Sequence, residues 1–390
     1  MLALAAVVSG APAVAAEAGG ERAAAFALPE PTGRYDVGTL EMRLVDEERL
    51  TGGRAREVMV SLWYPARHRP GRAPVPYLNA ELAGHYDRNA AMLGLEPGDV
   101  DFASAETHAQ DRAPVFPGRA ERPVVLYSPG GGNPRAFGTT LVEELASRGY
   151  IVVAMDHLGQ APIRFPDRFE LPADSPDMAA AMRERVADVR FTLDQLELLA
   201  DGGNPDAGGN RLPRGLGAAM DLSHTGMFGH SMGGFASAET MLDEPRIDAG
   251  INLDGSMNPP YGEAAERGVD RPFMLFGAGV SGPADEPHNH LYAPEWASFW
   301  HNSTGWRRDL YLADGEHMSF ADLQTFLPQI DAQIPLDEAL MASLGTVDPA
   351  RSLAVQRAYV TAFFDQHLRG RHQPLLDADS PAYPEVTFVE

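Results

Sequence analysis

The strongest constraint on the fold is an alternation of apolar runs and helical spacing in the second quarter of the chain. Residues 123–128 are largely apolar and end at the glycine-rich turn 129–132, after which helical spacing covers 137–147. Gly149 ends that helix, and residues 150–155 form a second apolar run. A strand, a helix and a strand at this spacing predict a right-handed parallel crossover unit.

The same alternation continues to the end of the chain. We predict further strands at 57–64, 226–228, 249–253, 272–276 and 308–312, and helices near 80–93, at 176–200 and at 355–368. With 390 residues, 44% of them hydrophobic, the chain is long enough for one large core. We therefore expect residues 35–390 to form one α/β domain, with a mostly parallel central sheet and helices on both faces.

The N-terminal residues have a different composition. Residues 1–16 hold a short apolar run and then small residues spaced as Ala13, Val14 and Ala15, which is typical of a secretory signal, although no basic residue precedes the run. Residues 17–34 are rich in Ala, Gly, Glu and Pro and predict a linker. The alternative is an Ala-rich leader on a cytosolic enzyme. From this pattern we predict secretion. We also predict no integral membrane segment, since no run reaches roughly 18 apolar residues.

The charge and the cysteine count exclude several functions. Acidic residues number 55 against 31 basic ones, for a net charge of -24, and every basic residue is Arg. Such a surface repels nucleic-acid phosphates and anionic headgroups, so we expect no nucleic-acid partner. With 0 Cys, the chain forms no disulfide, thiolate nucleophile or Cys-ligated zinc site.

One short motif predicts a nucleophile. Gly229, His230, Ser231, Met232 and Gly233 match the pattern G-x-S-x-G, in which small residues allow a sharp turn from a strand to a helix. So short a pattern is weak alone. Its place between an apolar strand and a helix-compatible run favours a nucleophilic Ser231 over a plain helix-entry turn.

A serine hydroxyl needs a base, and the base needs a carboxylate that fixes its tautomer. In chains with this motif the order is serine, acid, histidine. Of the histidines after Ser231, only His317 follows a predicted core strand directly, so we assign it as the base. Three of the others are alternatives that could line a pocket: His288 and His290, in a loop near Pro287, and His301, among aromatic residues. His367 and His372 lie in or after the last helix and are expected at the surface.

Two aspartates are candidates for the acid. Asp254 ends the strand 249–253, and Asp285 lies in the loop after the next strand. Both would lie at the carboxyl edge of the sheet, where ligands gather in open α/β folds. The residues alone favour Asp254, whose position is better defined, but leave Asp285 open.

The tetrahedral intermediate of an acyl transfer needs hydrogen-bond donors for its oxyanion. We expect one from the backbone N–H of Met232, the residue after the serine. The second is expected from the glycine-rich turn 129–132, and we choose Gly131. The alternative is a flexible turn without a catalytic part.

Seven segments together resemble the plasma-type platelet-activating factor acetylhydrolases and their bacterial relatives, in the α/β-hydrolase superfamily. They are 35–38 (YDVG), 62–66 (LWYPA), 128–132 (SPGGG), 145–150 (LASRGY), 229–234 (GHSMGG), 253–255 (LDG) and 317–322 (HMSFAD). The resemblance covers residues 35–369. It implies Ser231 as nucleophile, Asp254 as acid and His317 as base.

The resemblance also implies backbone donors at Gly131 and Met232, a small ester or phospholipid-like substrate, and no metal or organic cofactor. Pro129 stands where animal members carry His, and Gly131 replaces a bulkier residue, so acyl specificity stays open. The alternatives are a broad lipase or polyester-cleaving esterase, and a catalytically silent binding protein.

A cluster of aromatic residues precedes His317. The cluster either lines an apolar pocket or belongs to the core. Its members are Trp296, Phe299, Trp300 and Trp306.

Overall fold

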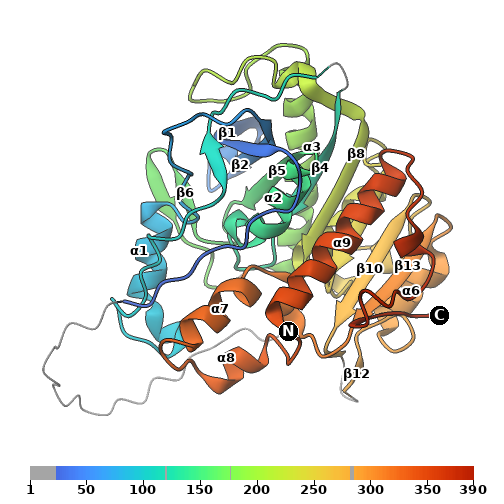
Figure 1. Cartoon of the computed structure of the whole chain (residues 1–390). Helices are drawn as coiled ribbons and strands as arrows, with labels where there is room; N and C mark the ends of the chain where they lie inside the picture. The colour runs from blue at the N-terminus through green and yellow to red at the C-terminus, as the bar shows by residue number, and fades with distance from the viewer. Residues whose placement is uncertain (1–22, 119–120, 176, 282–284) are drawn as a thin grey trace, which may run out of the picture.

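A mostly parallel sheet runs through the protein (Figure 1). The computed structural model describes residues 23–118, 121–175, 177–281 and 285–390. Within these residues the main sheet has ten strands, in the order β14-β13-β10-β9-β8-β4-β5-β2-β1-β3. Neighbours from β13 to β5 are parallel, as are β1 and β3, whereas the pairs β14–β13, β5–β2 and β2–β1 are antiparallel. The sheet that the sequence predicts is therefore confirmed.

The strands of the main sheet are β1 Asp36–Thr51, β2 Arg54–Ala66, β3 Ala109–Asp111, β4 Arg122–Ser128, β5 Ile151–His157, β8 Met220–His230, β9 Ala249–Leu253, β10 Phe273–Ala278, β13 Arg307–Leu312 and β14 Val386–Phe388. Two small hairpins pair β6 Ile163–Phe165 with β7 Arg168–Glu170, and β11 Val280–Ser281 with β12 Glu286–Pro287. The helices are α1 Ala80–Arg88, α2 Thr139–Ser147, α3 Met178–Ala200, α4 Met232–Met241, α5 Ala264–Arg267, α6 Pro294–Asn302, α7 Leu323–Asp331, α8 Glu338–Ala342 and α9 Pro349–His367.

Helices cover both faces of the sheet. Along β4, Val124 and Leu126 pack into the core shared with α3 and α4, whereas Val125 and Tyr127 pack into the core shared with α2 and α9. This alternation is the geometry of a pleated strand, whose successive side chains point to opposite faces. Because both faces are buried, the strand reads as a continuous apolar run in the sequence.

The predicted strand at 226–228 is confirmed but is longer than expected. It belongs to β8, which begins at Met220 because the strand pairs with β4 from Arg122 onward, across a register shift. The early part of β8 is polar and includes the exposed residues Ser223 and His224, so the hydrophobic pattern does not reveal it.

The segment 23–34 differs from the linker that its composition predicts. Ala24, Phe26 and Leu28 are buried in a third core beside the sheet, which they share with α1 and α7. The ring of Phe26 lies 5.1 Å from that of Phe326, centroid to centroid. Hydrogen bonds join the backbone of Ala25 and Ala27 to Gln333 and Gln329, so apolar packing and hydrogen bonds together hold this stretch on the domain. The predicted secretory signal lies outside the described residues.

Candidate active site

Ser231 lies at a strained turn between β8 and α4. Its backbone has φ 54° and ψ -124°, a conformation that a residue with a side chain rarely adopts. A Cβ on Gly233 would collide with the carbonyl oxygen of Ser128, and one on Gly229 would collide with Gly233 itself. The two glycines of the motif are thus required by the close approach of α4 to β4. The turn leaves the Ser231 side chain at the start of α4 and partly exposed.

His317 contacts both other members of the predicted triad. It opens a short helical turn, His317–Phe320, directly after β13. Its Nε2 lies 3.0 Å from Ser231 Oγ, and its Nδ1 lies 2.5 Å from Asp254 Oδ2. The carboxylate accepts from Nδ1–H, which leaves Nε2 free to accept the serine proton. The His317 side chain is 46% exposed, so the serine is accessible from the surface.

Asp254 is buried at the carboxyl end of β9. Burial by itself raises the pKa of the Asp254 carboxyl, but the charges and hydrogen bonds of His288 and His317 outweigh burial and hold that pKa well below its usual value. The carboxylate also accepts a hydrogen bond from the backbone N–H of Ala278, at 3.0 Å. The group is therefore an anion at neutral pH and is held from three sides.

Asp285, the other candidate acid, is exposed in the β11–β12 hairpin. In the described residues, the carboxylate that contacts His317 belongs to Asp254. The geometry thus brings together the three residues that the sequence favours.

His288 is a contact that the sequence did not predict. The sequence predicts a loop position for His288 and favours His317 as the base. Its Nδ1 lies 2.7 Å from Asp254 Oδ1, the oxygen that His317 does not contact. Burial lowers the pKa of His288, but the neighbouring Asp254 carboxylate outweighs this effect and the pKa is raised. The topology could have indicated this contact. His288 follows β10, the strand beside β9, and the ends of both strands lie at the same edge of the sheet.

His230, the second residue of the motif, forms a hydrogen bond with the backbone of His317. Its Nε2 lies 2.9 Å from the backbone carbonyl oxygen of His317, and the two rings lie 4.6 Å apart. Burial is the main cause that lowers the pKa of His230 to about 3. The ring is therefore neutral, and its Nε2–H donates to the His317 carbonyl.

The glycine-rich turn after β4 passes over the serine. A Cβ on Gly131 would lie 3.7 Å from Met232 Sδ, and a Cβ on Gly130 would lie 3.3 Å from Ser231 Cβ. The buried guanidinium of Arg185, on α3, donates to the carbonyl oxygens of Pro129 at 2.5 Å and Gly130 at 3.3 Å. The carbonyls of this turn are therefore held toward α3.

The aromatic cluster belongs mainly to the core. Trp296 and Phe299 are fully buried on α6. The Trp296 ring packs on His288 with centroids 4.3 Å apart, and its Nε1–H donates to the carbonyl oxygen of Gly255 at 2.9 Å. Trp300 stacks on His290, and Trp306 packs against α9. Trp296 thus packs against His288, which contacts Asp254, and it is part of the core and not the lining of an open pocket.

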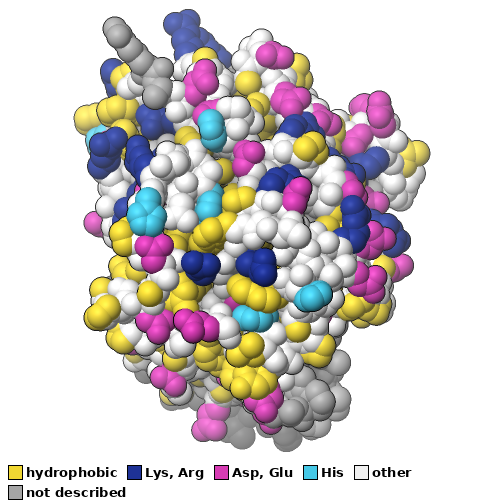
Figure 2. Space-filling view, turned by 90° about the vertical axis from the view of Figure 1, so that its right-hand side faces the viewer, with side chains coloured by type: hydrophobic (Ala, Val, Ile, Leu, Met, Phe, Trp, Pro, Cys, Tyr) yellow, Lys and Arg dark blue, Asp and Glu magenta, His cyan; other side chains and the backbone are white. Residues whose placement is uncertain are grey.

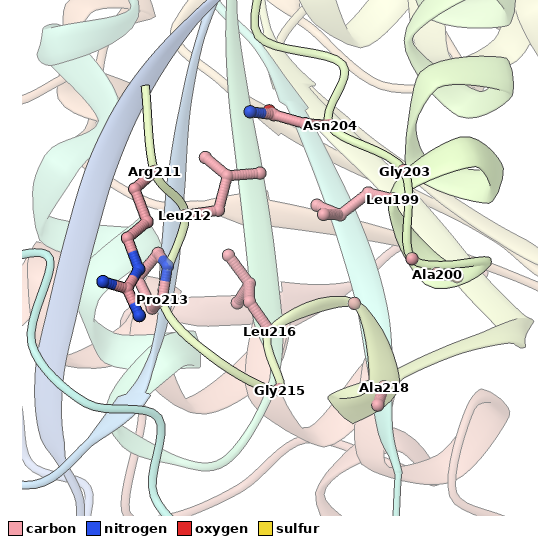
Figure 3. A pocket seen from close by; sticks show the side chains of 12 residues that line it. Leu199, Ala200, Gly203, Asn204, Arg211, Leu212, Pro213, Gly215, Leu216 and Ala218 are labelled. Carbon is pink, nitrogen blue, oxygen red and sulfur yellow. The ribbon is translucent and has the colours of Figure 1, made fainter. Parts of the chain in front are cut away.

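Two surface pockets lie outside the triad. One, of about 380 Å³, is lined by Leu199, Leu212 and Leu216 (Figure 3). This pocket lies near the start of β8, whereas Ser231 follows the other end of that strand. At about 3.3 Å per residue, the length of β8 places the pocket roughly 30 Å from Ser231. The other, also of about 380 Å³, lies beside His317 and includes Tyr311 and Glu316.

Two features of the described residues bear on metal and membrane binding: the grouping of their metal-ligating side chains and the length of their apolar helices. In the part of the chain that the structure describes, no group of three or more His, Asp or Glu residues is arranged to hold a metal ion. No helix among the described residues is long and apolar enough to cross a membrane. On the face in Figure 2, acidic and basic side chains are interspersed with hydrophobic ones.

A strained serine at the carboxyl edge of this sheet, with a histidine and a buried aspartate in line, defines the class of α/β-hydrolases. A family model described as platelet-activating factor acetylhydrolase, isoform II, matches residues 22–164. A solved structure of a ferulic acid esterase from Streptomyces cinnamoneus is 38% identical, with a TM-score of 0.76, and the match covers 94% of this chain and 99% of that one.

Two curated relatives carry related names. A probable 1-alkyl-2-acetylglycerophosphocholine esterase from Arthroderma benhamiae is 27% identical over 94% of each chain. A platelet-activating factor acetylhydrolase from Cavia porcellus is 24% identical over 64% of this chain and 59% of its own. The chain is an α/β-hydrolase and a serine carboxylic ester hydrolase, and its residues 22–164 resemble the platelet-activating factor acetylhydrolases.

Proposed function

We propose that Ser231, His317 and Asp254 form the catalytic triad of this esterase. Ser231 Oγ attacks the ester carbonyl while His317 Nε2 takes its proton. The imidazolium then gives that proton to the leaving alcohol, and an acyl-serine remains. A water molecule, deprotonated by His317, hydrolyses the acyl-serine and restores the free enzyme. Asp254 orients the imidazole and stabilises its cation throughout.

One observation carries the proposal: the line from Ser231 Oγ to His317 Nε2 at 3.0 Å and from His317 Nδ1 to Asp254 at 2.5 Å. Both distances are within hydrogen-bond reach, which a nucleophile and its base require. The burial of Asp254 strengthens its interaction with the imidazolium, because the surroundings are poor in water.

The backbone N–H groups of Gly131 and Met232 are the proposed oxyanion donors. In a trans peptide the C=O and the following N–H point in opposite directions. Because Arg185 holds the Gly130 carbonyl toward α3, the N–H of Gly131 is directed away from α3. The Met232 N–H is at the N-terminus of α4, where backbone donors have no partner within the helix. These orientations support a hole above Ser231.

Replacement of Ser231 by Ala tests the triad. We expect kcat for p-nitrophenyl acetate to fall on the order of 10⁶-fold, as it does when a triad serine is removed from another serine hydrolase. The remaining activity would come from substrate binding and the oxyanion hole alone. A fluorophosphonate probe is expected to label the wild-type protein and not the variant. Retained turnover in Ser231→Ala would overturn the assignment, and a wild-type protein without turnover or labelling would indicate a silent binding protein.

As substrate we propose a small ester, with the acetyl ester of an alkyl glycerophospholipid as the first candidate. The family and the name of the Arthroderma benhamiae relative support it. Hydroxycinnamoyl esters are the second candidate, supported by the match to the ferulic acid esterase at 38% identity.

A panel of substrates separates the candidates. It contains an acetylated alkyl phospholipid, methyl ferulate, and p-nitrophenyl esters from acetyl to palmitoyl. The highest kcat/KM on the phospholipid supports the first candidate, and the highest on methyl ferulate supports the second. A maximum on long acyl chains would instead indicate a broad lipase or polyester esterase.

We also propose that the protein is exported through residues 1–16. Their apolar run and the small residues after it support this. Expression of the full chain in a secreting host, followed by N-terminal sequencing of the protein in the medium, tests it. Cleavage after the Ala13–Ala15 spacing is expected, and an uncleaved protein in the cytosol would contradict export.

A further inference from the structure

We propose that His288 is a positioning residue of the active site, which holds the second oxygen of Asp254 and thereby fixes the carboxylate against His317. The inference rests on the proposed roles of Asp254 and His317. It adds a fourth side chain to the line of hydrogen bonds that ends at Ser231.

The contacts of the carboxylate carry this inference. Asp254 Oδ1 accepts from His288 Nδ1 at 2.7 Å and from the Ala278 backbone N–H at 3.0 Å. Asp254 Oδ2 is left for His317 Nδ1, at 2.5 Å. Two donors on one oxygen prevent rotation of the carboxylate about its Cβ–Cγ bond. The oxygen that faces the base is therefore always the same one.

The His288 ring is itself held rigidly. Its side chain is buried, and its plane packs on Trp296 with centroids 4.3 Å apart. The backbone N–H of His288 donates to the carbonyl oxygen of Gly279 at 3.1 Å, which ties this loop to the end of β10. Because the ring is buried and packed, it has few alternative orientations, so it can orient the group that it contacts.

The surroundings of Nε2, the ring nitrogen of His288 that faces away from Asp254, indicate that His288 acts through Asp254 alone. Among the described residues, His288 Nε2 is buried and has no hydrogen-bond partner. The ring therefore has no group among the described residues to which it could pass a proton, and its one hydrogen bond there is with the Asp254 carboxylate. The bond is donated from Nδ1–H in the neutral ring and in the cation alike.

Two substitutions separate position from packing. His288→Phe keeps a ring against Trp296 but removes the donor, and we expect kcat to fall by about 10- to 100-fold with KM nearly unchanged, the usual cost of losing such a supporting contact. His288→Asn restores a neutral donor near the Nδ1 position. We expect it to recover most of kcat.

The chain offers a matched control. His290 lies on the same loop, bonds Asp309 through Nδ1 at 2.7 Å and stacks on Trp300 with centroids 4.1 Å apart. It has the same burial and aromatic support but does not contact Asp254. We expect His290→Phe to lower the melting temperature while kcat stays within about twofold.

A spectroscopic readout completes the test. The low-field proton resonance of His317 Nδ1–H is expected to shift or broaden in His288→Phe and to stay unchanged in His290→Phe. Equal kcat in wild type and His288→Phe, or equal losses in the two Phe variants, would overturn the inference. If Asp254→Asn also retains activity, the proposed triad itself fails. If Asp254→Asn loses activity but His288→Phe does not, the triad stands and only the proposed role of His288 fails.

Discussion

Two buried polar assemblies lie on either side of Ser231, and they are built differently. The acid support consists of His288, Trp296 and the Ala278 backbone, packed between β10 and α6 around the carboxylate of Asp254. It contains one anion, a histidine and an indole. It contacts a proposed catalytic residue directly.

The oxyanion-loop support lies deeper, between β2, β4, β5 and α3. Arg185 holds the turn after Ser128, whose Oγ lies 2.9 Å from His157 Nε2. His157 Nδ1 lies 3.0 Å from Asp188 Oδ2, and Asp188 accepts from Arg56 at 2.6 and 2.7 Å. This assembly contains three buried charged groups, Arg56, Asp188 and Arg185, which the side chains of His157 and Ser128 connect. It reaches the reaction only through backbone groups.

The two assemblies are expected to respond differently to mutation. A buried charge that loses its partner costs about 3–5 kcal/mol, because an uncompensated ion stays in the core. The oxyanion-loop support should therefore couple catalysis to folding stability. In the acid support, Asp254 keeps the Ala278 N–H and His317 as donors when His288 is replaced, so we expect the loss of His288 to change kcat more than stability.

The largest effect is expected at the acid itself. Asp254→Asn keeps the size of the side chain but removes the charge and the tautomer control, so we expect kcat to fall by about 10⁴-fold. Asp285→Asn serves as the control, and its kcat is expected to equal that of wild type. Steady-state kinetics on p-nitrophenyl acetate measure both. A larger loss at Asp285 would reverse the assignment.

A smaller effect on rate, joined to a loss of stability, is expected at Arg185. Arg185→Met frees the carbonyls of the oxyanion turn, so we expect a loss of about 10²- to 10³-fold in kcat, comparable to the loss of one oxyanion donor. Affinity for a trifluoromethyl ketone inhibitor should fall with kcat, while KM changes little. Unfolding in urea should show lower stability as well. A variant that loses stability but keeps kcat would separate the turn from catalysis.

The smallest effect is a pH dependence of stability that comes from His157. Burial, followed by the charge of Arg185, lowers the pKa of His157 to about 4 from 6.5. Between these values the unfolded chain binds a proton that the folded protein excludes, so the free energy of unfolding falls as the pH falls. The contribution is about 3 kcal/mol across the window.

Urea unfolding at pH 7 and pH 4.5 measures this contribution. His157→Asn cannot be protonated in this range, so its stability should fall less with acid than that of wild type. Identical pH slopes for the two proteins would show that His157 is not the group responsible.

The sequence was sufficient for the parts of the site that local rules determine. Gly229, Ser231 and Gly233 follow from the steric needs of the turn, and the structure has the tight contacts that those needs imply. Asp254 and His317 follow the ends of parallel strands, and such ends meet at one edge of a sheet. The central sheet was predictable because apolar runs have a period that separates strands from helices.

The remaining features depend on tertiary packing, which no local pattern encodes. His288 and Arg185 reach the site because a loop and a helix fold back over strands that are distant in sequence. The burial of Phe26 depends on α7, about 300 residues further along the chain. The Ala-, Gly-, Glu- and Pro-rich composition of residues 17–34 predicts a linker, and it does not reveal that Ala24, Phe26 and Leu28 are buried.

The central claim is that Ser231 carries the acyl group during ester cleavage, and mass spectrometry of the acylated enzyme tests it most directly. The protein is mixed briefly with excess p-nitrophenyl acetate, quenched in acid, digested and mapped. We predict one added acetyl group on the peptide that contains Ser231, and its absence in Ser231→Ala. An acetyl group on another side chain, or steady turnover without any acylated peptide, would contradict the account.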